Sequence, residues 1–124
     1  DSIVRGTTSK KIVEMVRDAG AKEVHMRIAS PPTAHPCFYG IDTPKRKELL
    51  AAKMSVKEME KFLSVDSLAF ISMDGIYKAM GEKKRDGETP QFCDACFTGE
   101  YPIPTTDHDD GKTDSQLSLL VRLA

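Results

Sequence analysis

The sequence predicts an α/β fold in which helices cover a parallel sheet, and three observations support this prediction. Helical and strand-like periodicities alternate over residues 9–80, which is the wiring of a parallel sheet. A Gly-Thr-Thr-Ser run precedes the first helical pattern, as phosphate-binding turns do in such sheets. Residues 91–104 break the alternation, because they are rich in turns and contain a Cys-x-x-Cys pair. We therefore expect part of a parallel sheet, followed by a loop-rich, cysteine-containing C-terminal segment.

Length and composition limit the classes of protein to consider. The chain has 124 residues, which corresponds to at most one domain by the usual length prior. Charged residues make up 30% and the formal net charge is -1, so neither nucleic acid nor a membrane is expected as a partner. No apolar run approaches the roughly 20 residues of a membrane-spanning helix, and no signal peptide is recognisable, which favours a cytoplasmic protein. The chain begins at Asp1 rather than at methionine, which suggests a fragment or a processed product.

The first nine residues combine groups that suit a phosphate and a sugar. Gly6 lets the backbone approach an anion, and the hydroxyls of Thr7, Thr8 and Ser9 can donate to phosphate oxygens. Amides at the start of the following helix add further donors and a positive dipole end. Asp1 suits ribose hydroxyls or a magnesium ion, which prefers carboxylate and water oxygens. The alternative is that Thr8 or Ser9 only caps the helix.

The first helix and the first strand follow this run. A helix is expected over about 9–19, with Ser9 as its cap and Gly20 ending it. Alternating apolar residues then predict a strand over 23–29, with His25 as an ordinary surface residue on its polar face. In such sheets the ligand lies beyond the carboxyl ends of the strands. The helix is predicted from apolar residues at helical spacing, namely Ile12, Val13, Met15, Val16 and Ala19.

Two helices are expected before the second strand. Proline at the first helical position predicts a helix over 44–52, with Leu49 and Leu50 facing inward. A capping-box pattern over 55–58 starts a second helix that ends near residue 63.

The second strand and the C-terminal part complete the expected element order. The apolar run over 67–72 predicts a strand, and Asp74 then caps a helix that Gly81 stops. The charged run over 82–88 is interpreted as a solvated loop, with phosphate binding by its Lys and Arg residues as the alternative. A polar, flexible stretch is expected over 105–115 and a short helix over 116–123.

Three cysteines form the second candidate site. Cys37 follows the first strand through a loop, whereas Cys93 and Cys96 lie together on a turn. Three soft ligands suit zinc or an iron–sulfur cluster, and spacing alone favours zinc with His35 or His108 as fourth ligand. A redox role is less favoured, because no thioredoxin-like strand precedes the pair. Three unligated thiols are the remaining alternative.

Three segments resemble one enzyme family, and in the family's order. DSIVRGTTS, ASPPTAHPCFYGIDTP and CDACFTGEYPIP are similar to the glutamine phosphoribosylpyrophosphate (PRPP) amidotransferases, or amidophosphoribosyltransferases. The resemblance implies the C-terminal part of a type I phosphoribosyltransferase domain over 1–81, and a cysteine-containing extension with a flexible tail over 82–124. It also implies that an N-terminal glutaminase domain, an upstream strand and an acidic residue of the sugar site are missing from this chain.

The resemblance further implies a glycosyltransferase of purine biosynthesis that makes 5-phosphoribosylamine from PRPP and glutamine. The PRPP loop would comprise Asp1, Gly6, Thr7, Thr8 and Ser9, with Asp1 also binding Mg2+. No catalytic residue is expected in this chain, which would be inactive alone.

One branch of the family holds a 4Fe-4S cluster, and the resemblance assigns three of its ligands to Cys37, Cys93 and Cys96. The fourth ligand would lie outside this chain. Exposed sheet edges also favour a homo-oligomer. The competing hypothesis is a stand-alone, zinc-stabilised binding module.

Overall fold

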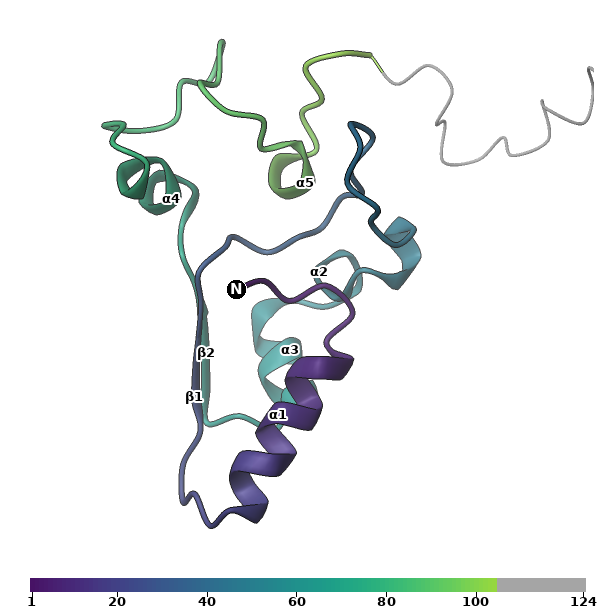
Figure 1. Ribbon diagram of the computed structural model, residues 1–124, viewed down its shortest axis with the longest axis vertical. Helices are drawn as coiled ribbons and strands as arrows, with labels where there is room; N and C mark the ends of the chain where they lie inside the picture. The colour runs from purple at the N-terminus through teal and green to yellow at the C-terminus, as the bar shows by residue number, and fades with distance from the viewer. Residues whose placement is uncertain (105–124) are drawn as a thin grey trace, which may run out of the picture.

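The computed structural model describes residues 1–104 and has a two-stranded parallel sheet with helices packed on one side (Figure 1). Helices α1 (Thr7–Asp18) and α3 (Val56–Leu63) pack against each other, and α3 also packs on strand β2. The expectations for 105–115, 116–123 and His108 lie outside the described residues. Within 1–104, no helix is long and apolar enough to cross a membrane.

The sheet confirms the predicted α/β class and its parallel pairing. Strand β1 (His25–Ile28) pairs in parallel with β2 (Ser67–Phe70), so that Met26 lies beside Leu68. One face of the pair packs into the core through Ile28 and Leu68, while His25 is exposed as expected. Both strands are shorter than the predicted runs over 23–29 and 67–72, although single backbone hydrogen bonds extend the pairing beyond each end.

Helix α1 begins earlier than the sequence suggests. Its N-cap is Gly6, in the left-handed conformation with φ 81°, so the prediction that Ser9 caps a helix over 9–19 is wrong. Glycine adopts this φ without the steric cost that a Cβ would bring, so the chain can turn into the helix here. Of the apolar residues in the helical pattern, Val13 is buried, whereas Ile12, Met15 and Val16 are 51%, 69% and 41% exposed. Gly20, at φ 96°, follows the end of the helix, as predicted.

The predicted helix over 44–52 is replaced by two short turns. A 3-10 turn, η1 (Arg46–Glu48), is followed by the single α-turn α2 (Leu50–Lys53). Leu49 is extended between them, and the Leu50 N–H donates to the carbonyl of Val4 at 2.8 Å rather than within a helix. Leu49 and Leu50 are nevertheless buried, as predicted, because this contact fixes the turn against the N-terminal segment.

The N-terminal caps of α3 and α4 can be compared with the predicted ones. Helix α3 has the predicted capping box, in which Ser55 and Glu58 exchange hydrogen bonds. Helix α4 (Met73–Ala79) is capped by Ser72, whose hydroxyl accepts from the Gly75 N–H at 3.0 Å. The prediction that Asp74 caps this helix is therefore wrong, because the helix starts one residue before Asp74.

The hydrophobic core lies between the sheet and the helices α1 and α3. Helix α4 and the single-turn helix α5 (Ala95–Thr98) lie beyond the carboxyl ends of the strands and contribute none of the core residues (Figure 1). Contacts outside the main core therefore hold the C-terminal part of the described chain. The core residues are Ile3, Val13, Ile28, Leu50, Met59, Leu63, Val65 and Leu68.

Candidate functional site

The Gly-Thr-Thr-Ser run lies at the amino end of α1. This helix runs opposite to the two parallel strands, so its amino end and the carboxyl ends of the strands point to the same side (Figure 1). That side is where ligands bind in open α/β sheets. The wiring thus brings the predicted phosphate-binding residues to the edge at which parallel α/β proteins place their sites.

The hydroxyl groups of this run are available to a ligand. Thr7 and Thr8 are exposed and Ser9 is partly exposed. Helix α1 has no side-chain cap, so its first amides keep their donors, and within residues 1–104 the three hydroxyls form no hydrogen bond. The alternative that Thr8 or Ser9 caps the helix is therefore excluded, because both residues lie inside it. An exposed amino end with spare donors can bind an anion.

Packing requires glycine at position 6, whether or not an anion binds there. A Cβ built on Gly6 would lie 2.7 Å from Leu50 Cδ2 and 3.2 Å from Phe62 Cε1. Gly6 is buried under these side chains, and its φ lies in the region that favours glycine. The glycine therefore allows α1 to begin close to α2 and α3, which sets the direction of its amino end.

Asp1 offers one carboxylate near the start of the chain. This side chain is exposed and accepts a hydrogen bond from the Ser2 N–H at 2.5 Å. Mg2+ commonly uses one or two carboxylates together with waters and substrate phosphates, so a single exposed carboxylate fits part of such a site. The nearby Arg5, which the sequence analysis did not single out, is paired with Glu48 at 3.0 Å.

The structure brings the cysteine-bearing segments together. The carbonyl of Cys96 accepts hydrogen bonds from the N–H groups of Ala34 and His35, both at 3.1 Å. The N–H of Cys37 donates to Thr43 Oγ1 at 2.7 Å, which fixes the loop that carries it. Segments about 60 residues apart in sequence therefore lie side by side at this point.

Aromatic contacts hold the same two segments further along the chain. The Tyr101 hydroxyl donates to the Pro36 carbonyl at 2.6 Å, and the Phe38 and Tyr101 rings lie 4.9 Å apart. The Tyr39 hydroxyl donates to the Ile103 carbonyl at 2.9 Å and accepts from the Ile103 N–H at 3.0 Å. The loop over 36–39 and the chain over 101–103 therefore form one packed unit.

None of the three cysteines forms a disulfide, and the Cys37 sulfur accepts a hydrogen bond from the Tyr39 N–H at 3.4 Å. Burial raises the pKa of the Cys96 thiol, against a backbone hydrogen bond that lowers it, and the nearby Cys37 and Cys93 raise it further. Among residues 1–104, however, no three His, Cys, Asp or Glu side chains converge closely enough to hold one metal ion. This arrangement gives no support to a zinc site with His35.

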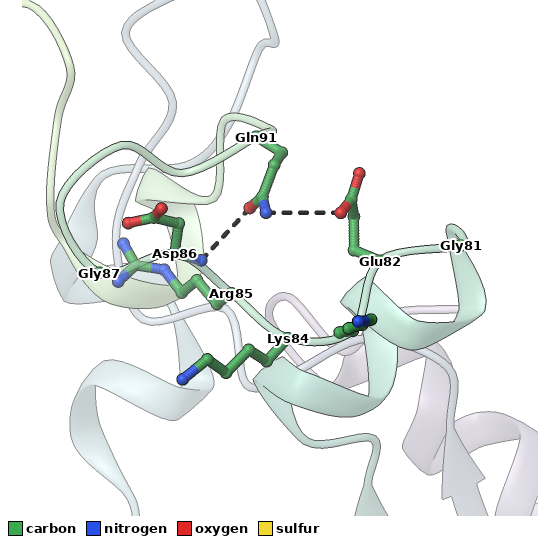
Figure 2. Close-up of a pocket in the computed structure, with 8 residues that line it drawn as sticks. Gly81, Glu82, Lys84, Arg85, Asp86, Gly87 and Gln91 are labelled. Carbon is green, nitrogen blue, oxygen red and sulfur yellow. Dashed lines mark hydrogen bonds between the residues drawn. The ribbon is translucent and has the colours of Figure 1, made fainter.

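A pocket beside the cysteine-bearing segment lies apart from the Gly-Thr-Thr-Ser run. A pocket of about 560 Å³ is formed by the charged loop over 81–87 together with Gln91 (Figure 2). Gln91 closes one side of it, accepting from the Asp86 N–H at 3.3 Å and contacting Glu82 at 3.5 Å. Three basic and two acidic side chains line the pocket, and one of the basic ones, Arg85, is already paired with Asp94 and Glu100.

One feature was missed by the sequence analysis, which treated residues 82–88 as a solvated loop. The Arg85 side chain is only 15% exposed and forms an ion pair with Asp94, inside the Cys-x-x-Cys turn. The sequence offered one usable signal, a charged residue between two cysteines. The partner of that residue could not be read from spacing.

No family model matches the chain, but individual proteins do. The chain is 54% identical to amidophosphoribosyltransferase 1, chloroplastic, of Arabidopsis thaliana, over 86% of its own length and 18% of that protein. The amidophosphoribosyltransferase of Bacillus subtilis is 56% identical over 82% of this chain and 21% of the relative. That of Rhizobium etli is 51% identical over 97% of this chain and 24% of the relative. The chain thus spans about a fifth of the length of these relatives.

Solved structures give the same result for the fold. Glutamine PRPP amidotransferase from B. subtilis, complexed with ADP and GMP, superposes with a TM-score of 0.75 at 53% identity, covering 83% of this chain and 22% of that one. A structure described as the allosteric regulatory enzyme of purine biosynthesis superposes with a TM-score of 0.74 at 55% identity. The predicted fold, part of a phosphoribosyltransferase-type α/β sheet, is confirmed.

Proposed function

We propose that this chain forms the PRPP-binding part of an amidophosphoribosyltransferase. More than four-fifths of the chain is homologous to such enzymes, and the matched region covers about one-fifth of their length. The complete enzyme would transfer nitrogen from glutamine to PRPP and release 5-phosphoribosylamine, glutamate and pyrophosphate, at the start of purine synthesis. One observation supports the proposal most directly. The Gly-Thr-Thr-Ser run, which resembles the family's PRPP loop, forms the start of a helix without a side-chain cap, and the hydroxyls of Thr7, Thr8 and Ser9 make no hydrogen bond within residues 1–104.

The chemistry at the sugar requires orientation more than a catalytic base. Ammonia attacks C1 of the ribose, and the pyrophosphate leaves with the bonding electrons. In this proposal the amides and hydroxyls of Thr7, Thr8 and Ser9 bind the 5-phosphate, with Gly6 setting the direction of the helix start. Asp1 binds the ribose hydroxyls or the Mg2+ that accompanies the pyrophosphate. Holding the sugar at a fixed distance from the incoming ammonia lowers the entropic part of the barrier.

The cysteines have a different role in the proposal. Cys37, Cys93 and Cys96 would supply three thiolates to a 4Fe-4S cluster, and a residue outside this chain would supply the fourth. Ligation of these cysteines would tie the loop over 31–43 to the segment over 91–104. A homo-oligomer and a cytoplasmic location remain predictions.

The phosphate-loop proposal predicts that Thr8→Val weakens PRPP binding. In the full-length protein that contains this chain, the change removes one hydroxyl donor to a charged phosphate while keeping the shape of the side chain. The loss of such a bond corresponds to about 1–3 kcal/mol, or about 5- to 150-fold in the dissociation constant of Mg-PRPP, measured by calorimetry.

Matched variants make the test specific. Thr8→Ser retains the hydroxyl and should retain most of the affinity, and Ser2→Ala changes an exposed hydroxyl outside the Gly-Thr-Thr-Ser run. Ribose 5-phosphate should show the same pattern as PRPP, whereas ribose should not bind. Equal PRPP affinity in Thr8→Val and the wild type would remove the phosphate-binding assignment.

Asp1→Asn probes the metal part of the proposal. It should raise the Mg2+ concentration needed for half-maximal PRPP use, because a charged oxygen ligand becomes a neutral one. The measurement is the magnesium dependence of pyrophosphate release in the full-length enzyme. An unchanged dependence would assign the ion to other residues.

A further inference from the structure

Asp94 is buried between the two cysteines of the Cys-x-x-Cys turn. It is 5% exposed, and it is the only charged residue among the buried residues of the described chain. Burying a carboxylate costs free energy unless hydrogen bonds and opposite charge replace its water. A buried charge at this position therefore needs a reason other than packing.

The carboxylate of Asp94 is held from three directions. The Tyr77 hydroxyl of α4 donates to it at 2.8 Å, Arg85 Nε donates at 2.5 Å, and the Thr98 hydroxyl lies 3.2 Å away. Arg85 also donates to Glu100, on the far side of the turn. Burial by itself would raise the pKa of Asp94, but the hydrogen bonds from Arg85 and Tyr77 outweigh it and lower the pKa.

Apolar burial offers this segment little alternative support. Between residues 82 and 104, Ala95 is the only buried hydrophobic residue in the described chain, and the main core takes no residue from this range. Tyr77, 1% exposed, is the anchor on α4, and its ring lies 5.7 Å from that of Phe92. The contacts of Asp94 are therefore one of the main supports of the Cys-x-x-Cys turn, beside the hydrogen bonds to the Cys96 carbonyl.

The same contacts reach the third cysteine. The backbone carbonyl of Asp94 accepts from the N–H groups of Phe97 and Thr98, which starts the single turn of α5. At that turn, the carbonyl of Cys96 accepts from the loop that leads to Cys37. Hydrogen bonds thus tie α4 to Asp94 in the Cys-x-x-Cys turn, and the same turn to the loop that leads to Cys37.

We propose that Asp94, held by Tyr77 and Arg85, is a positioning residue that orients Cys93 and Cys96, and through them the Cys37 loop, for cluster binding. The proposal rests on the cysteine ligands assigned under the proposed function. Asp94 does not bind iron in this proposal. It holds the ligand segment in place before the cluster is inserted, in a region that has almost no hydrophobic core.

The test uses the full-length protein with two near-isosteric variants, Asp94→Asn and Tyr77→Phe, and the control Lys84→Gln, which changes an exposed charge beside Arg85. The first readout is hydrogen exchange of the amides of residues 97–99 in metal-free protein, with the β1 and β2 amides as internal reference. We expect about tenfold faster exchange at 97–99 in both variants, and no change in the reference amides or in the control.

The second readout is iron and sulfide content with the visible absorption spectrum after anaerobic reconstitution. We expect both variants to retain less iron than the wild type, with Arg85→Lys intermediate between Arg85→Ala and the wild type, because lysine keeps the charge but not the forked donors. The inference is overturned if Asp94→Asn has the same amide exchange rates and the same iron content as the wild type. Equal acceleration in β1 and β2 would also overturn it, because the effect would then be a general loss of stability.

The design separates this inference from the proposed cluster. If the wild-type protein and Cys93→Ser both lack iron and sulfide, while the variants still exchange faster only at 97–99, the cluster assignment fails and the positioning of the turn is supported. If Cys93→Ser loses iron but Asp94→Asn does not, the cluster assignment stands and the positioning role is refuted.

Discussion

At the scale of single residues, Gly6 illustrates how one position serves both packing and the candidate site. Its left-handed φ and its approach to Leu50 together fix where α1 begins. The exposed hydroxyls of the next residues then follow from the helix start. A glycine that suggests phosphate binding in the sequence is thus also required by the core.

Gly6→Ala should be strongly destabilising. The left-handed conformation costs a non-glycine residue about 1–2 kcal/mol, and the contact with Leu50 at 2.7 Å adds a packing cost of about 1–3 kcal/mol. Gly20→Ala is the matched control, because Gly20 has φ 96° but nothing within 4 Å of the added Cβ. Urea unfolding should therefore show a larger loss of stability for Gly6→Ala, and equal losses would contradict the packing argument.

Asp66 should make stability depend on acid pH. A hydrogen bond from the Val24 N–H lowers the pKa of Asp66 below its ordinary value of 3.8, against burial that raises it, and Arg17 lowers it further. Because the pKa is lower in the folded state, the stabilisation is present above the ordinary value and is lost as the pH falls through the folded value.

Asp66→Asn should thus reduce stability at neutral pH and flatten the fall in stability below about pH 4. The measurement is the unfolding free energy as a function of pH, with the exposed Asp18→Asn as control. An acid limb identical to that of the wild type would show that the contacts between Asp66, Val24 and Arg17 do not persist in solution.

At the scale of elements, α3 is the helix whose ends the sequence describes best. Its capping box was predicted from Ser55 and Glu58, and both hydrogen bonds of the box are present. Ser55→Ala should destabilise the protein by about 1 kcal/mol, because a first-turn amide loses its acceptor. Thermal unfolding checks this, with Ser2→Ala as an exposed control, and an unchanged midpoint would indicate that α3 is held by packing alone.

A substitution at the C-terminal end of α3 should instead increase the stability of the protein. Ser64 ends the helix with φ 58°, the only described non-glycine residue with a positive φ. Ser64→Gly removes the steric strain of that conformation, although glycine gains entropy in the unfolded chain. We expect a small net stabilisation, up to about 1 kcal/mol, in the same unfolding measurement. A clear destabilisation would mean that the serine side chain makes a contact of its own.

At the scale of the whole molecule, stability should be unevenly distributed. The core joins the sheet to α1, α2 and α3, whereas α4 and the cysteine-bearing segment lie outside it and are attached by hydrogen bonds, an ion pair and aromatic contacts. Native-state hydrogen exchange should protect the amides of β1 and β2 more strongly than those of α5 in metal-free protein. Equal protection throughout would contradict a separation between core and cysteine segment.

The sequence by itself determined the class of fold and the local signals. Period-2 and helical patterns placed two strands and the helices α1, α3 and α4 close to their observed positions, because these patterns reflect which face is buried. The capping box of α3 is wholly local, so it was predictable. The family resemblance in three short motifs also came from sequence, and relatives at 51–56% identity confirm it.

Features that depend on contacts between residues far apart in sequence were decided only by the tertiary structure. Leu50 donates to Val4 instead of continuing a helix from residue 44, and Arg85 turns inward to Asp94 instead of remaining in solvent. Neither choice is encoded within a window of neighbouring residues, because each depends on a partner that the fold brings near. The meeting of the Cys37 loop with the turn at Cys96 has the same origin, since backbone hydrogen bonds across some 60 residues set it.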